Sequence, residues 1–163
     1  MIKAGSSFFY MGKRCIVGAV ILLKELPYMV TVSHIFRGEG DSLIVDGMRL
    51  TVTRVLKDFD LALIKLPPEC MVKITEIGSA AELEEAFLVN DTHIIRCRVV
   101  NAGVSLLYLG FRCLDMPEPG DSVSPIMQAG KVIGIISSVM LDNCMGITIS
   151  SVVLLSLERY AGL

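Results

Sequence analysis

The sequence has little of what metal, nucleic-acid and membrane proteins usually require. Its 163 residues include only two histidines, and none of its five cysteines lies in a C-x-x-C pair. Without metal-ligand spacing or a cofactor motif, we expect neither a metal site nor a cofactor. The net charge is -2, with no basic arm or cluster, which argues against nucleic acid as the main partner.

Long apolar segments are also absent. The longest clean apolar run, 15–23, is interrupted by Gly18 and is too short to span a bilayer. Residues 1–10 lack the apolar core of a signal peptide, so we expect a cytoplasmic protein. Accordingly, the cysteines are interpreted as buried, reduced thiols in preference to a disulfide framework.

What the chain does contain is an excess of short apolar runs. Hydrophobic residues make up 53% of the sequence, in runs separated by Gly, Pro, Asp or Asn, which is typical of an all-β protein. Asp46-Gly47 predicts a two-residue hairpin. A capping-box pattern predicts a helical turn over 79–82, and Ser150 or Ser151 is expected to cap a helix over 152–160. The expected strands are 8–11, 15–22, 29–33, 42–45, 48–56, 61–66, 87–90, 93–100, 104–111, 124–128, 132–139 and 146–149.

Two prolines, Pro67 and Pro68, divide these strands into two groups of about six, because proline removes a ladder donor and favours an extended link. We therefore predict a boundary near Cys70, with an N-terminal unit over 1–70 and a C-terminal unit over 71–163. The expected fold is two packed six-stranded antiparallel β-barrels with a C-terminal helix. The apolar excess is compatible with a homo-oligomer.

Three polar residues follow one another in an order that suggests catalysis. His34 ends one expected strand, Asp60 leads into another, and Ser122 lies on a Gly-Asp-Ser turn. Each has an ordinary interpretation alone: a surface or core histidine, an exposed turn aspartate and a common turn tripeptide. The chain order His, Asp, Ser is nevertheless that of one type of serine-protease triad.

The motifs around these residues resemble those of trypsin-like serine proteases. Thr-Val-Ser-His at 31–34 is similar to the family's Thr-Ala-Ala-His, 60–66 resembles its aspartate strand, and 120–125 resembles its Gly-Asp-Ser-Gly-Gly-Pro loop. Segments 45–60 and 77–79 are similar to the HtrA/Deg branch. The resemblance covers roughly 15–160 and implies a double β-barrel endopeptidase domain without a PDZ domain, acting on polypeptides.

The resemblance also implies roles for individual residues. Ser122 would be the nucleophile, His34 the general base, and Asp60 the residue that orients His34. The backbone N–H groups of Gly120 and Ser122 would form the oxyanion hole. A pocket preferring small or medium apolar side chains would receive the residue before the cleaved bond, and substrate would add as an edge strand along 137–139. The expected substrate-binding residues are Met116, Ser137, Ser138, Val139 and Gly146.

Val123-Ser124 stands where the family has Gly-Gly after the nucleophile. Because Val123 is β-branched, we expect it in the β region of backbone space. Segment 16–19 is interpreted as a barrel strand, so we expect no zymogen cleavage, and the partner of Asp121 stays open. Two alternatives to an active endopeptidase remain: an inactive or latent protease-fold binding module, and a structural all-β protein whose motif matches are accidental.

Overall fold

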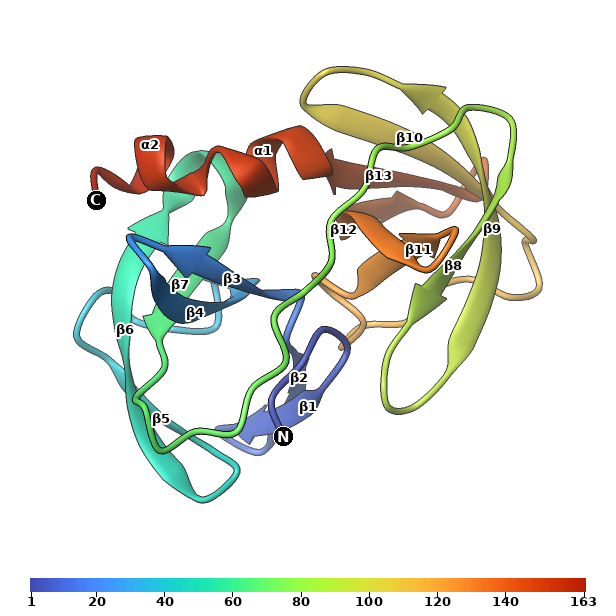
Figure 1. The fold of residues 1–163 in the computed structure, drawn as a ribbon. Helices are drawn as coiled ribbons and strands as arrows, with labels where there is room; N and C mark the ends of the chain where they lie inside the picture. The colour runs from blue at the N-terminus through green and yellow to red at the C-terminus, as the bar shows by residue number, and fades with distance from the viewer.

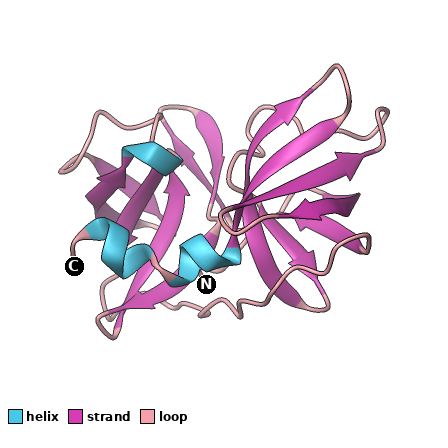
Figure 2. Ribbon diagram, turned by 90° about the horizontal axis from the view of Figure 1, so that it is seen from above, coloured by secondary structure: helices cyan, strands magenta, loops and turns pink.

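The N-terminal strands form a hairpin beside an open antiparallel sheet. The computed structural model describes residues 1–163, and its two β-rich lobes lie side by side (Figures 1 and 2). In the first lobe, β1 (Ser7–Tyr10) pairs with β2 (Lys13–Ile16). The sheet beside them has the order β3-β4-β7-β6-β5. Its strands are β3 (Ala19–Leu23), β4 (Leu26–Val32), β5 (Ser42–Val45), β6 (Met48–Leu56) and β7 (Leu61–Lys65), with a short 3-10 helix η1 (Lys57–Phe59) before β7.

The C-terminal strands close into a six-stranded antiparallel barrel. Its order is β10-β13-β12-β11-β8-β9, and β9 pairs again with β10. Each strand of this lobe therefore has a partner strand on both sides, although not along its full length. The predicted all-β fold of two packed lobes with C-terminal helices is therefore confirmed, with a closed six-stranded barrel in the second lobe and a partial, five-stranded barrel sheet in the first. The strands are β8 (Glu85–Val89), β9 (Ile94–Ala102), β10 (Leu106–Phe111), β11 (Pro125–Gln128), β12 (Lys131–Met140) and β13 (Met145–Ser150).

The chain ends in two short helices, the first against β12 and β13 of the barrel and the second against β6 of the first lobe (Figure 1). The predicted helix 152–160 is instead α1 (Ser151–Leu155) and α2 (Leu157–Ala161), separated by Ser156. Ser156 Oγ donates back to the carbonyl oxygen of Val152 at 2.8 Å, a bond that competes with continuation of the helix. Ser150 is the N-cap residue, but its hydroxyl donates to Val104 instead of capping α1.

Two other local predictions were wrong. The expected strand 15–22 is divided at Gly18 into β2 and β3. A Cβ added at Gly18 would lie 2.6 Å from the carbonyl oxygen of Val123, so a glycine permits the close approach of the other lobe. No helical turn forms over 79–82, where the N–H of Ala81 donates to the side chain of Gln128 at 2.7 Å.

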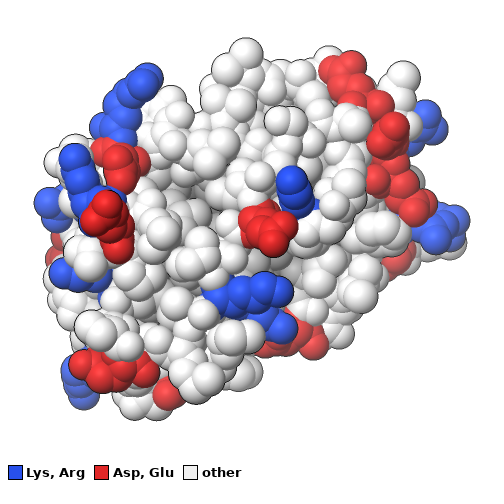
Figure 3. All heavy atoms as spheres, viewed as in Figure 1, with Lys and Arg blue, Asp and Glu red and all other residues white.

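Three apolar clusters hold the structure together. One lies inside each lobe, and the third spans both lobes, combining Leu61 of the first sheet, Ile135 of the barrel and Leu157 of α2. This shared cluster fixes the lobes against each other, since separating them would expose buried apolar surface. On the face in Figure 3, Lys and Arg side chains are mixed with Asp and Glu, both at the two sides and near the centre. No helix has the length and apolar composition needed to cross a membrane.

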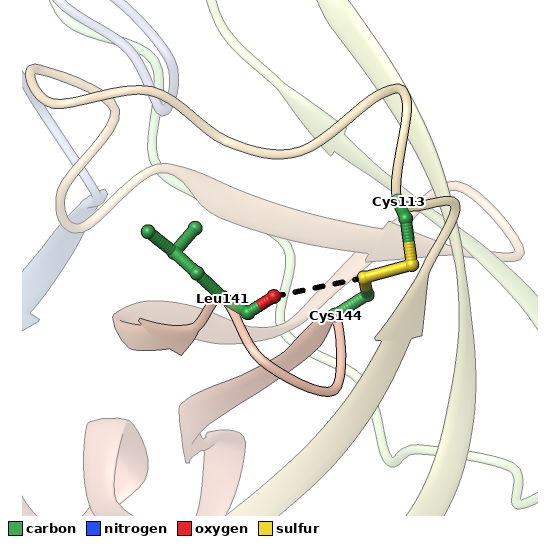
Figure 4. The surroundings of a disulfide bond; sticks show 3 residues. All are labelled: Cys113, Leu141 and Cys144. Atoms are coloured by element: carbon green, nitrogen blue, oxygen red, sulfur yellow. Dashed lines mark hydrogen bonds between the residues drawn. A yellow bond between two sulfur atoms is a disulfide. The ribbon is translucent and has the colours of Figure 1, made fainter.

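The expectation that all five cysteines are reduced was wrong for one pair. Cys113, after β10, and Cys144, in the turn between β12 and β13, form a disulfide with a Cα–Cα distance of 5.3 Å (Figure 4). Cys15, Cys70 and Cys97 are free. Burial raises the pKa of Cys97 to about 12, so this thiol is protonated and unreactive at neutral pH.

Candidate active site

The turns after β4 and before β7 bring His34 and Asp60 together. His34 Nδ1 lies 2.7 Å from Asp60 Oδ2. The other carboxylate oxygen accepts from the backbone N–H of His34 at 2.9 Å and from the Ser33 hydroxyl at 2.7 Å. With Nδ1 donating to the carboxylate, the tautomer leaves Nε2 free to accept a proton. Burial alone would raise the pKa of Asp60, but the hydrogen bonds from Ser33 and His34 outweigh it and lower that pKa.

Ser122 and His34 line the same hollow between the two lobes. The hollow has a volume of about 620 Å³. Its first-lobe side is formed by β2, Val32, His34 and Ile35, and its second-lobe side by Pro119, Gly120 and Ser122. The Ser122 hydroxyl makes no hydrogen bond to any protein atom. The structure thus brings the three predicted catalytic residues to one region, with the serine hydroxyl still unengaged.

The turn holding Ser122 leaves two backbone donors free. Gly120 has a φ of +99°, which a glycine adopts without steric cost. The N–H of Asp121 donates to Glu118 and that of Val123 to Ile136. The N–H groups of Gly120 and Ser122 donate to no protein acceptor. Paired unengaged N–H groups beside a hydroxyl are what stabilisation of an oxyanion requires.

Asp121 is the most buried charged residue of this region, with 1% of its surface exposed. Its carboxylate contacts Arg14 Nη2 at 3.0 Å, His93 Nε2 at 2.8 Å and Asn90 Nδ2 at 3.0 Å. It also accepts from the backbone N–H of Glu118 at 2.8 Å. Burial opposes ionisation, but these hydrogen bonds outweigh it and lower the pKa of Asp121. The network therefore supplies the partners of Asp121 that sequence analysis left open.

Sequence analysis missed Arg14, Asn90 and His93 as supports of the nucleophile turn. A buried carboxylate requires hydrogen-bond or ion-pair partners, so a partner for Asp121 could have been predicted from its burial. Nothing local in the sequence identifies which cation it is, since Arg14 lies 107 positions from Asp121. Only the folded arrangement, with β2 packed behind the turn, brings them together.

Val123 does not have the expected β conformation. Its φ is +60°, in the left-handed region that is costly for a β-branched residue. Val123 is 3% exposed and packs in the cluster shared by the two lobes, so apolar burial offsets the backbone strain. Val123 thus has the left-handed backbone conformation that a glycine would adopt more easily at this position of the turn.

The predicted substrate-binding residues lie at one end of the closed barrel. Val139 pairs with Gly146 across β12 and β13, and Met116 packs against the barrel cluster. Ser137 and Ser138 are exposed. On its other side, β12 pairs with β11 as far as Ile135, and the backbone of Ile136 bonds to Val123 and Ser124, so the edge is open only beyond Ile136. The structure contains no cluster of three or more His, Cys, Asp or Glu residues suited to a metal ion.

The two packed β-rich lobes with their C-terminal helices have the double-barrel fold of trypsin-like serine proteases. The chain superposes on Thermobifida fusca Protease A with a TM-score of 0.74 at 15% sequence identity, covering 96% of this chain and 95% of that one. A Nocardiopsis protease gives a TM-score of 0.72 at 17% identity, covering 97% and 96%. Cellulomonas bogoriensis chymotrypsin gives 0.68 at 17% identity, covering 98% and 95%.

These similarities establish the fold, as the resemblance of the sequence motifs predicted. A scan against protein-family models finds no match, and a search of curated proteins finds none either. At these identities a shared fold does not by itself carry an activity. The function must be argued from the site.

Proposed function

We propose that the chain is a serine endopeptidase whose catalytic triad is His34, Asp60 and Ser122. The observation that carries the proposal is the 2.7 Å contact between His34 Nδ1 and Asp60 Oδ2, beside a hollow that both His34 and Ser122 line. That contact fixes the tautomer, so the free Nε2 can act as a general base toward a hydroxyl.

In the proposed reaction, Ser122 Oγ attacks the carbonyl carbon of a peptide bond while His34 takes its proton. The developing oxyanion is received by the N–H groups of Gly120 and Ser122, which have no protein acceptor. His34 then gives the proton to the leaving amine, and water completes hydrolysis by the reverse sequence. Asp60 stabilises the charged imidazole throughout.

The substrate is proposed to be an extended polypeptide. The edge of β12 beyond Ile136 can pair with an incoming strand, because its backbone groups are used neither by β11 nor by the nucleophile turn. Met116, Ser137, Ser138, Val139 and Gly146 remain the proposed binding residues. With Val139 opposite Gly146, we expect small or medium apolar side chains before the cleaved bond.

The alternative function is a latent or inactive protease-fold module that binds peptides. One observation favours it: the Ser122 hydroxyl is not hydrogen-bonded to His34. Activation of the Ser122 hydroxyl would then depend on a conformational change that substrate binding brings about.

The prediction of a cytoplasmic location is opposed by the Cys113–Cys144 disulfide, since disulfides persist mainly in oxidising compartments.

The proposal is tested by labelling with a fluorophosphonate, which reacts only with an activated serine. We expect stoichiometric labelling of the wild-type protein at Ser122 and none in Ser122→Ala. Ser42→Ala, which removes an exposed hydroxyl on β5, is the matched control and should label like wild type. Folded protein that fails to label would favour the latent module.

A further inference from the structure

The hollow at Ser122 has an unbalanced charge. Lys13 and Arg14 of β2 line it, and no Asp or Glu does. Arg14 already contacts the buried carboxylate of Asp121 at 3.0 Å, so its charge is largely used by the protein. Lys13 is exposed and takes part in none of the ion pairs of the structure. It is therefore the uncompensated positive charge of the hollow.

The residues that line the hollow indicate which side of the cleaved bond it binds. The residues proposed to hold the chain before the bond, among them Ser138, Val139 and Gly146, do not line it. It is formed instead by β2 and Ile35, facing Pro119 and Gly120. Because Ser122 and His34 line the hollow together with these residues, the hollow is left for the part of the substrate that departs as the amine.

We propose that the protein selects substrates with an acidic side chain at the first or second residue after the cleaved bond, and that Lys13 is the residue that determines this selection. A carboxylate entering a hollow that contains Lys13 and no acidic group is attracted, whereas a lysine is repelled. The inference rests on the proposed function and specifies its substrate class.

Acyl transfer to an added amine tests the leaving-group side of the site alone, because the acyl group has no residues before the bond. p-Nitrophenyl acetate acetylates Ser122 Oγ with release of p-nitrophenolate. The amine of an added dipeptide amide then attacks the acetyl carbonyl, the ester bond to Oγ breaks, and the amine proton returns through His34 to Ser122. Mass spectrometry measures the N-acetyl dipeptide amide against the acetate formed by water. The added amines are Glu-Ala amide, Ala-Glu amide and their lysine counterparts.

For wild type at low ionic strength, we expect about five-fold more transfer to at least one glutamate dipeptide than to its lysine counterpart, the scale of one exposed ion pair. The ratio should fall toward one in 0.5 M salt and reverse in Lys13→Glu. Lys3→Glu makes the same charge change at an exposed residue that does not line this hollow, and should keep the wild-type ratio.

Equal transfer to glutamate and lysine dipeptides, or a glutamate preference that survives Lys13→Glu, would overturn the inference and leave the proposed function intact. Failure of p-nitrophenyl acetate to acetylate Ser122 would overturn both. The fluorophosphonate experiment separates these two cases, because it reports the activated serine without using the leaving-group side.

Discussion

Asp60 shows how a single carboxylate organises this site. Its two oxygens receive the Ser33 hydroxyl, the His34 backbone and the His34 imidazole. The side chains of His34 and Asp60 are 63% and 46% exposed, so their mutual attraction is screened by water and adds little to stability. The contact matters for orientation of the imidazole.

Replacing Asp60 by Asn should therefore separate activity from stability. An amide can donate to His34 and favour the wrong tautomer, so we expect the rate of fluorophosphonate labelling to fall by about 10⁴-fold. The free energy of unfolding, measured with urea, should change by less than about 1 kcal/mol. Labelling at the wild-type rate would remove Asp60 from the catalytic triad.

At the scale of elements, the junction of β2 and β3 supports the nucleophile turn from behind. Gly18 lies at this junction, and its position leaves no room for a Cβ next to the Val123 carbonyl oxygen. Arg14 of β2 reaches the carboxylate of Asp121 on the same turn. The turn is thus held by a segment that belongs to the other lobe.

Gly18→Ala should displace this turn. A methyl group 2.6 Å from a backbone oxygen requires the backbone to move, which we expect to cost about 1–3 kcal/mol in the free energy of unfolding and to slow labelling of Ser122. The control is Gly110→Ala on β10, where the nearest atom is a Val100 methyl at 3.3 Å. Equal labelling of both variants would show that the junction does not support the turn.

The elements also show what sequence could and could not predict. Asp46 and Gly47, with φ of +50° and +76°, form the predicted hairpin of β5 and β6 because turn chemistry is local. His34 and Asp60 were predicted from the chain order His, Asp, Ser and from the motifs around them, because a position at a strand end has an ordinary interpretation by itself. The division at Gly18 and the left-handed Val123 depend on the approach of the two lobes, which local patterns do not encode.

At the scale of the whole molecule, one ionic network joins the lobes. Arg14 comes from the first lobe, while Asp121, His93 and Asn90 come from the second. The network lies directly beside Ser122. Any condition that protonates the Asp121 carboxylate should therefore weaken both the contact between the lobes and the packing of the nucleophile turn.

Acid should be such a condition. The pKa of Asp121 is lower in the folded protein than its ordinary 3.8, so the unfolded state binds protons more readily and stability rises with pH. The stabilisation is complete above about pH 5 and is lost as pH falls through the folded pKa. Urea unfolding at pH 7 and pH 3 should show this loss in wild type.

Asp121→Asn should be less stable at pH 7 by about 3 kcal/mol, because Arg14 and His93 lose their buried partner. Its free energy of unfolding should also fall less steeply between pH 5 and pH 2 than that of wild type. Identical acid dependence in both proteins would show that other carboxylates control acid unfolding.

The central claim is cleavage of peptide bonds by Ser122. The most direct measurement incubates an unfolded protein substrate with the wild-type chain, Ser122→Ala or Ser42→Ala, and identifies the new amino termini by mass spectrometry. The account predicts new termini with wild type and Ser42→Ala and none with Ser122→Ala. Termini that appear equally with Ser122→Ala, or none with a wild-type protein that labels at Ser122, would contradict it.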